Sequence, residues 1–309
     1  MVPLYVTEGE VAELLTPADA FAAVEASLER LAAGDVDNRT RISLDLPDGT
    51  FAAMPCVDRG LGYAGLKTFA WAPAGTPFLV VLFALDGRLE AIVEAERMGR
   101  LRTAAASAVA ASRLARSGAR TLGVFGNGRQ AAAHVQALRD ALSGLERVVV
   151  QGRDAKRVAA FCTEHDCTRA EEPREAGECD VVVTATTSKD PVLRGEWLLP
   201  GAFVCAIGAN SLTERELDDV VLERATFVCC DSRAQAREEA GDLVEPIEHG
   251  VLDWLEVHEL SEVVTGELAG RADDDDIVVF KSSGLAAWDL AAAARVLDRA
   301  RERGAGREL

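Results

Sequence analysis

The sequence has little positive charge and very little lysine. Its 309 residues carry 33 lysine and arginine side chains against 51 aspartate and glutamate side chains, a formal net charge of −18. A protein that binds nucleic acid or an anionic membrane surface needs a basic face, so neither is expected as a main partner. Only four of the basic residues are lysines. This acidic, lysine-poor composition fits a protein from a high-salt cytoplasm, and an acidic protein from an ordinary cytoplasm is the alternative.

The sequence also lacks the patterns of membrane insertion, secretion and zinc binding. No apolar run reaches the roughly 20 residues that span a bilayer, and the N-terminal segment MVPLYVTEGEVAELL carries acids but no basic region, so no signal peptide is expected. The seven cysteines lack C-x-x-C spacing and the four histidines lack H-x-x-x-H spacing. We therefore expect reduced thiols, no metal site and a cytoplasmic location.

The first third of the chain reads as a mixed α and β region. The 309 residues correspond to about two domains at roughly 150 residues each. Thr7 and Glu10 have the spacing of a capping box, which predicts a helix start. Strand-like segments follow over about 41–93, and Asp86-Gly87 between the last two is a hairpin signal. The pattern predicts an α+β domain with an antiparallel sheet.

A different pattern begins at residue 118. Residues 94–117 predict a long helix rich in alanine and serine, and apolar strands then alternate with helix-like stretches. Such strands are typical of a parallel sheet covered on both faces. The predicted fold class is α/β, with a Rossmann doubly wound sheet over 118–283. The α+β domain takes 1–117 and is joined by the C-terminal helix within 284–309.

The sharpest local motif is GNGRQA at residues 126–131. It follows the strand TLGVF and opens the helix-like stretch QAAAHVQALRDAL, which is the context of a dinucleotide-binding turn. The first glycine makes the turn, and the second lets the backbone approach a pyrophosphate at the helix N-terminus. A structural turn without a ligand is the alternative. The predicted cofactor ligands here are Gly126, Asn127, Gly128, Arg129 and Gln130.

The end of the next strand bears on the choice between NAD and NADP. The strand VVVQ carries no carboxylate at its tip, and Arg153 follows two residues later, where it can pair with a 2′-phosphate. Asp154 complicates this interpretation, because its carboxylate could instead cap the following helix. We expect NADP as the cofactor, with NAD as the alternative.

Eight segments along the chain resemble one known family. In order they read RTRISLDL…MP, GYAGLKTF, LRTAAASA, FGNGRQA, TATTS, AIGANSLTERELD, EAGDL and FKSSGLAAWDLAAA. Together they are similar to the ornithine cyclodeaminase/μ-crystallin family, which includes an archaeal type of alanine dehydrogenase and ketimine reductases. The resemblance covers about residues 5–300. It implies a Rossmann domain, a substrate domain that also forms a homodimer, and a cleft between the two.

By motif, the resemblance places the ligands of the substrate carboxylate at Arg41, Lys67 and Arg102. Guanidinium groups suit a planar carboxylate, and cations in a very acidic protein attract an anionic substrate. Ordinary surface salt bridges are the alternative. Lys67 lies in the apolar strand AGLKTFAW, where burial would lower the pKa of its ammonium group. That suits a proton donor or acceptor for a C=O or C=N group.

Two residues depart from the cyclodeaminase pattern. Asn210 stands where cyclodeaminases carry an acid/base aspartate, and an amide can hold a water or an amine but cannot take a proton. Ala52 stands where their glutamate reads the side-chain amine of ornithine. We therefore expect hydride transfer, in which Lys67 and Asn210 act on the reacting group, rather than cyclisation of ornithine to L-proline and ammonia.

The remaining assignments from the resemblance concern the cofactor. The hydroxyls of Thr184 and Thr186 are expected to face its riboses, Ser283 and Gly284 to line the nicotinamide pocket, and Thr103 to reach its phosphates.

The sequence therefore predicts an NAD(P)-dependent oxidoreductase that interconverts a small 2-oxo or imino acid and its amino acid, like alanine dehydrogenase or a ketimine reductase. The alternatives are an ornithine cyclodeaminase and a small-ligand binding protein of the μ-crystallin type. Asp289, in AWDL, is expected either to support the site or to make a surface or intersubunit contact. Met54, Phe69, Trp71 and Phe78 either line the pocket for the substrate side chain or belong to the core.

Overall fold

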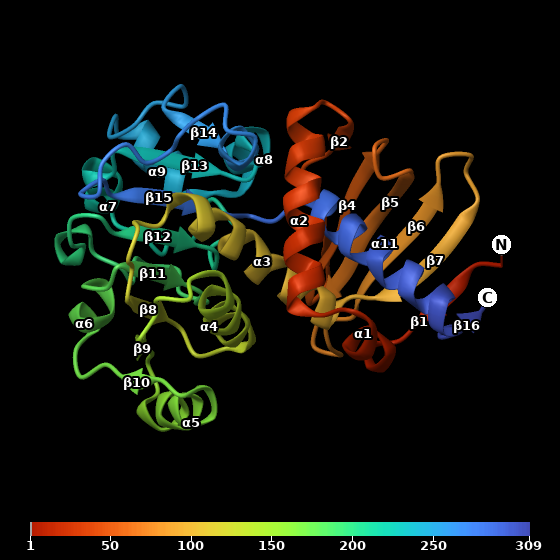
Figure 1. Ribbon diagram of the computed structural model, residues 1–309, viewed down its shortest axis with the longest axis horizontal. Coiled ribbons are helices and arrows are strands. Elements are labelled where there is room, and N and C mark those ends of the chain that lie inside the picture. The colour runs from red at the N-terminus through yellow and green to blue at the C-terminus, as the bar shows by residue number, and fades with distance from the viewer. Residues whose placement is uncertain (1) are drawn as a thin grey trace. The chain divides into compact units, whose positions relative to one another are not determined.

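The computed structural model describes residues 2–309, which form two compact units (Figure 1). The first unit contains residues up to 106 together with 284–309, and the second contains residues 107–283. The division falls inside helix α3 (Glu96–Leu114), which runs on without a break from one unit into the other. The sequence placed the boundary at the end of this helix.

A mostly antiparallel sheet forms the first unit, in the order β16-β1-β7-β6-β5-β4-β2, with β3 paired to β4. Antiparallel pairing over β2–β7 confirms the prediction, including the hairpin at Asp86-Gly87. Strand β1 departs from it and pairs parallel to β7. The strands are β1 (Leu4–Val6), β2 (Val36–Asn38), β3 (Ile42–Leu46), β4 (Gly49–Asp58), β5 (Tyr63–Trp71), β6 (Phe78–Ala84), β7 (Leu89–Glu94) and β16 (Arg307–Glu308).

Besides the first part of α3, the described part of the first unit has the helices α1 (Glu8–Leu14), α2 (Pro17–Ala32) and α11 (Ala286–Arg303). The predicted capping box of Thr7 and Glu10 starts α1. Helix α11 packs against α2 and against strands β4, β5 and β6. This arrangement explains why its alanine-rich sequence is buried on most sides. It also brings the first turn of α11 over the middle of the sheet.

The second unit is a doubly wound sheet whose paired strands all run parallel, in the order β10-β9-β8-β11-β12-β15-β13-β14. The order reverses between β8 and β11, the switch point at which such sheets bind ligands. The predicted Rossmann fold is confirmed. The strands are β8 (Thr121–Phe125), β9 (Arg147–Gln151), β10 (Thr168–Arg169), β11 (Val181–Thr184), β12 (Phe203–Ala206), β13 (Phe227–Cys230), β14 (Val257–Glu259) and β15 (Val278–Lys281).

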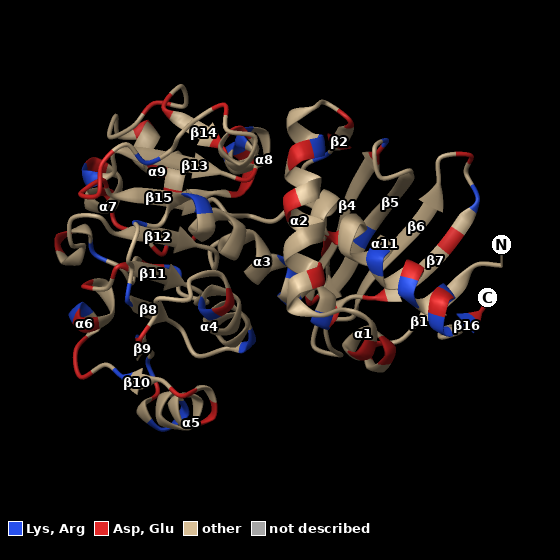
Figure 2. Ribbon diagram, viewed as in Figure 1, with Lys and Arg blue, Asp and Glu red and all other residues tan. Residues whose placement is uncertain are grey.

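Helices and loops cover this sheet, and its apolar strands form the core of the unit. The helices are α4 (Arg129–Ala141), α5 (Ala155–His165), α6 (Pro173–Gly177), α7 (Asp219–Arg224), α8 (Arg233–Glu239), α9 (Gly241–Glu248), α10 (Leu260–Val264) and a 3₁₀ turn at Gly195–Trp197. Figure 2 shows acidic residues spread over helices and loops of both units. Within residues 2–309, no helix is both long and apolar enough to cross a membrane.

Candidate active site

Two of the three predicted carboxylate ligands meet on one buried acid in the first unit. Lys67 is the central residue of β5, Arg102 lies in α3, and Asp289 lies in the first turn of α11. The Nζ of Lys67 and the Nε of Arg102 both donate to Oδ1 of Asp289, at 3.1 and 2.9 Å. Lys67 is 5% exposed, Arg102 is 6% exposed and Asp289 is fully buried. Segments more than 180 residues apart in the chain thus meet in one charge cluster.

Arg41 lies next to this cluster. The β3–β4 ladder begins with the pair Ile42–Ala53, directly after Arg41, and Met54, the next residue of β4, pairs with Lys67 of β5. Its guanidinium carbon lies 6.0 Å from the centre of the Phe69 ring, and its charge lowers the pKa of Lys67. The structure therefore brings together Arg41, Lys67 and Arg102, as the family motifs suggested.

Burial lowers the pKa of Lys67 from 10.5 to about 8. Repulsion from Arg102 and Arg41 acts in the same direction as burial, whereas Asp289 opposes it. This confirms the shift predicted from the apolar strand. An ammonium group with a pKa near 8 can give and take a proton close to neutral pH, which an exposed lysine cannot do.

The cluster keeps hydrogen-bonding capacity that the protein does not use. Nη1 of Arg102 and Oδ2 of Asp289 are buried without a hydrogen-bond partner. Gly284, at φ +83°, lies against the Arg102 guanidinium, and a Cβ there would stand 2.6 Å from Nη1. A buried, unused N–H donor is costly, so this donor fits an anionic ligand such as a carboxylate.

The wall beside Lys67 is apolar. The Phe69 and Phe78 rings contact each other at an angle of 38° with their centres 5.1 Å apart, and the Phe78 ring centre lies 5.5 Å from the Lys67 ammonium. Of the four residues considered for the side-chain pocket, Met54 is a core residue at 1% exposure and Trp71 is 69% exposed. Phe69 and Phe78 are half-buried and remain the candidates for contact with a substrate side chain.

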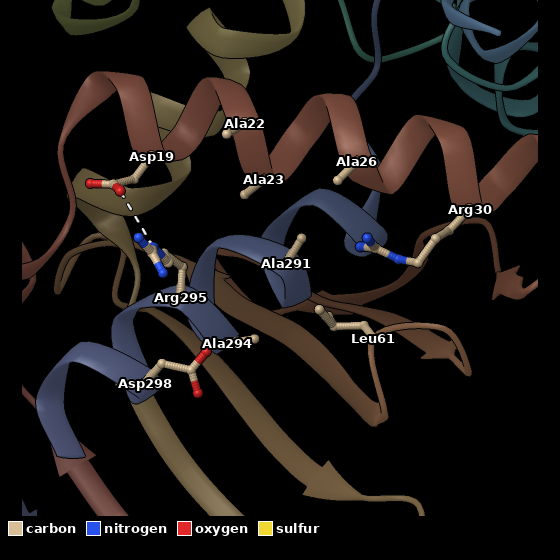
Figure 3. A pocket seen from close by; sticks show the side chains of 10 residues that line it. All are labelled: Asp19, Ala22, Ala23, Ala26, Arg30, Leu61, Ala291, Ala294, Arg295 and Asp298. Carbon is tan, nitrogen blue, oxygen red and sulfur yellow. Dashed lines mark hydrogen bonds and ion pairs between the residues drawn. The ribbon is translucent and has the colours of Figure 1, made fainter. Parts of the chain in front are cut away.

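A separate open cavity of about 280 Å³ lies between α2 and α11 of the first unit (Figure 3). Five alanines and Leu61 form much of its lining, and Asp19 pairs with Arg295 at 3.3 Å at its edge. None of its lining residues belongs to the Lys67 cluster. It is therefore a groove between packed helices, distinct from the charged site.

In the second unit, the glycine turn has the form that a dinucleotide requires. Gly126 adopts φ +115°, and a Cβ there would overlap the carbonyl oxygen of Ala185. Gly128 is the N-cap of α4 and has no side-chain cap, and a Cβ at Gly128 would meet nothing within 4 Å. The N-terminus of α4, where a helix has backbone N–H groups without intrahelical partners, thus faces open space, which fits a pyrophosphate.

Arg153 and Asp154, which follow β9, differ in their contacts. Asp154 caps α5 by accepting hydrogen bonds from the backbone N–H groups of Lys156 and Arg157, at 2.9 and 3.2 Å. Its carboxylate therefore caps the helix, which is one of the two roles that the sequence left open for Asp154. Arg153 is exposed.

The hydroxyls of Thr184 and Thr186, which the sequence analysis predicts to face the cofactor, make hydrogen bonds within the protein. Both donate to the fully buried carboxylate of Glu216, each at 2.8 Å. The backbone N–H groups of Thr186 and Gly208 also donate to it, at 2.7 and 2.6 Å. Burying an isolated carboxylate costs free energy unless hydrogen bonds compensate for the lost water. The two hydroxyls therefore help to stabilise the buried Glu216 carboxylate.

Glu216 belongs to a buried charged network that the sequence did not reveal. Asp242 accepts from the backbone N–H groups of Glu216 and Leu217, and its other oxygen lies 3.0 Å from the ammonium of Lys281. Lys281 also donates to the carbonyl of Ala209 at 2.6 Å. The network fixes the chain just after β11 and β12. The one sign of this buried network in the sequence was Lys281, a lysine at the end of the apolar strand VVFK.

Three other predicted positions are occupied by internal contacts. Asn210 is exposed, and its amide donates to the carbonyl of Gly208 at 3.2 Å. The Thr103 hydroxyl donates to the carbonyl of Gly99 in its own helix at 2.7 Å. The Ser283 N–H donates to Asp231 at 2.9 Å. No group of three or more side chains in residues 2–309 is arranged to hold a metal ion.

Comparison with known proteins gives consistent relatives. The model of the ornithine cyclodeaminase/mu-crystallin family matches residues 1–304. An alanine dehydrogenase of Archaeoglobus fulgidus is 32% identical over 100% of this chain and 98% of its own length.

Two solved structures match nearly all of the chain. A Delta(1)-pyrroline-2-carboxylate reductase of Thermococcus litoralis, in complex with NADH and L-proline, has a TM-score of 0.93 and 26% identity, with 99% of this chain and 100% of that chain covered. An archaeal alanine dehydrogenase dimer with bound NAD has a TM-score of 0.93 and 31% identity, with 100% and 99% covered.

Proposed function

Because the chain belongs to the ornithine cyclodeaminase/mu-crystallin family, we propose that it interconverts a small imino or 2-oxo acid and the matching amino acid. It is an NAD(P)-dependent oxidoreductase. The observation that carries the choice of substrate class is the buried cluster of Lys67 and Arg102 on Asp289, with its unused guanidinium donor. An α-carboxylate supplies the acceptor that this donor lacks.

The residues of the first unit have separable roles in this reaction. Arg102 and Arg41 bind the α-carboxylate and so orient the neighbouring C2 atom. Lys67 donates a proton or hydrogen bond to the imine nitrogen or carbonyl oxygen on C2, which makes that carbon more electrophilic. In the reverse direction, the neutral amine of Lys67 accepts the proton. Asn210 holds the amine or a water.

The second unit holds the cofactor. The turn over 126–130 and the N-terminus of α4 bind its pyrophosphate. When bound, the nicotinamide supplies or accepts the hydride.

We propose NADP rather than NAD as the preferred form. Arg153 is exposed and available to a 2′-phosphate, and Asp154, the nearby acid, caps α5. A KM for NADPH well below that for NADH, with the preference lost in Arg153→Ala, would support this proposal, and a strong NADH preference would refute it.

The substrate side chain is small and uncharged in this proposal. Phe69 and Phe78 supply an apolar surface beside Lys67, and Ala52 provides no carboxylate to bind a side-chain amine. This favours the imine of a short or cyclic apolar amino acid, and it disfavours ornithine. A panel of cyclic imines, and of 2-oxo acids with ammonium, tests the choice. Release of proline and ammonia from ornithine would instead identify a cyclodeaminase.

A homodimer through the first unit is part of the proposal. Leu44 in β3 is 59% exposed and Phe51, its partner on the neighbouring strand β4, is 38% exposed, and all five residues of β3 are exposed. Such apolar exposure on neighbouring strands is typical of a protein–protein interface. Light scattering should give twice the chain mass of 32.9 kDa. Leu44→Glu should shift it to the monomer, and a wild-type monomer would refute the proposal.

We also propose a high-salt cytoplasm as the working environment. The net charge of −18 causes self-repulsion that salt screens, and seven free thiols suit a reducing compartment. Thermal unfolding against KCl concentration is the test. Stability should rise steeply with salt, and full stability at low salt would exclude this environment.

The direct test of the function compares Lys67→Ala and Arg102→Ala with Lys156→Ala, a change at an exposed lysine of the second unit. Loss of general acid catalysis is worth roughly 10²–10⁴-fold, so the first variant should lose that much imine reduction. Arg102→Ala should raise KM for the imino acid. Cofactor binding, read from nucleotide fluorescence, should survive in all three. Tight ligand binding by a wild-type protein without turnover would indicate a binding protein instead.

A further inference from the structure

Asp289 is the residue around which the cation cluster is arranged. It is fully buried in the first turn of α11. A single oxygen, Oδ1, accepts from both Lys67 and Arg102, although a carboxylate has two oxygens to share. The second oxygen, Oδ2, is also buried and has no hydrogen-bond partner.

This use of one oxygen fixes the two cations relative to each other. Two positive groups that lie within 3.1 Å of the same oxygen repel one another, and they stay together because the shared negative charge holds them. Removing one partner of such a buried cluster leaves an uncompensated charge, which is costly. Two cations share one carboxylate, so the pair keeps one net positive charge for an anionic substrate.

We propose that Asp289 is a positioning residue that holds the Lys67 ammonium and the Arg102 guanidinium side by side and keeps the ammonium protonated at neutral pH. This proposal rests on the proposed function, in which Arg102 binds the substrate carboxylate and Lys67 transfers the proton. Asp289 contacts neither hydride donor nor acceptor in this scheme and acts only through Lys67 and Arg102.

The charged groups that act on Lys67 come from three parts of the first unit. Arg102 of α3 and Arg41 before β3 lower its pKa, and Asp289 of α11 raises it. On β4, burial and the charge of Asp289 both raise the pKa of the Cys56 thiol, to about 12, so this thiol stays neutral at working pH. Asp289 is therefore the one named neighbour that favours the charged form of Lys67. Without its charge, burial and two cations act on Lys67 unopposed.

The test uses the small number of lysines. The chain has four, so [ε-¹³C]lysine labelling gives four NMR signals, and Lys67→Arg assigns the one of interest. The signal of Lys67 should titrate near pH 8 in the wild type. Asp289→Asn keeps the shape and an acceptor oxygen but removes the charge, and it should lower this midpoint by about one pH unit or more.

Asp58→Asn is the matched control. Asp58 is also a fully buried carboxylate of the first unit, and it pairs with Arg30 at 2.9 Å. Its substitution should leave the Lys67 midpoint unchanged. Asp289→Glu should restore the midpoint while raising KM for the imino acid, because the charge returns at a displaced position. An unchanged midpoint in Asp289→Asn would overturn the proposal.

A second variant, Arg102→Gln, tests the proposal independently in case Asp289→Asn folds poorly. Arg102→Gln leaves the carboxylate to Lys67 and removes a repelling cation, so the midpoint should rise above that of the wild type, and an unchanged value would count against the cluster. The titration does not depend on turnover. If the midpoints move as expected but no imino acid is reduced, the proposed function fails while the positioning role stands. If reduction proceeds and the midpoints do not move, only the positioning role fails.

Discussion

The pH dependence of the two reaction directions depends on one group, Lys67. Burial and two neighbouring cations lower its pKa from 10.5 to about 8, which corresponds to about 3 kcal/mol against the charged form. At pH 7 about nine-tenths of the enzyme then carries the ammonium, and at pH 9 about one-tenth does. Imine reduction needs the proton, so its kcat/KM should fall about tenfold per pH unit above pH 8.

Amino acid oxidation should behave in the opposite way. It needs the neutral amine of Lys67, so its kcat/KM should rise with pH and level off above about pH 8. Initial rates of nucleotide absorbance change between pH 6 and 10 measure both directions, and cofactor affinity measured over the same range serves as the control. Parallel profiles in the two directions, or a single break near 10.5, would refute the assignment of Lys67.

Three further predictions concern backbone and network positions. Gly126→Ala places a Cβ against a backbone carbonyl and should weaken cofactor binding at least tenfold in an equilibrium titration. Gly62→Ala is the control: Gly62 also has a positive φ, +86°, but lies in open space, so this change should lower the free energy of unfolding by only about 1 kcal/mol. Glu216→Gln places an amide among four hydrogen-bond donors and should lower the free energy of unfolding by about 2–4 kcal/mol, measured by denaturant titration. A change below about 0.5 kcal/mol would show that the buried Glu216 carboxylate does not stabilise the fold. Gly284→Ala presses on the Arg102 guanidinium and should raise KM for the imino acid while leaving KM for the cofactor unchanged.

Features carried by local sequence could be predicted. The glycine turn at 126–128 depends on backbone conformation and on the strand and helix that flank it, all within about twenty residues. The burial of Lys67 could be expected from the apolar residues that flank it in β5, and Lys67 is the one buried residue of that strand. The capping box at Thr7 could be predicted because its two residues lie only three positions apart.

Contacts between distant segments could not be predicted in this way. Asp289 reaches Lys67 across 222 positions, and nothing in AWDL distinguishes it from an acid on a helix surface. Thr184 lies at a strand end where a hydroxyl normally meets a ligand, and only the fold reveals that Glu216 is buried beneath it. The parallel pairing of β1 with β7 also depends on the complete sheet.

The most direct measurement follows a labelled hydrogen. The enzyme is supplied with a C4-deuterated reduced nicotinamide nucleotide and, in turn, with Δ1-pyrroline-2-carboxylate or with pyruvate and ammonium, and the amino acid formed is analysed by mass spectrometry. The account predicts an amino acid carrying one deuterium at C2, formed by the wild type and lost in Lys67→Ala. Cofactor that binds but is never consumed, or an amino acid formed without deuterium, would contradict it.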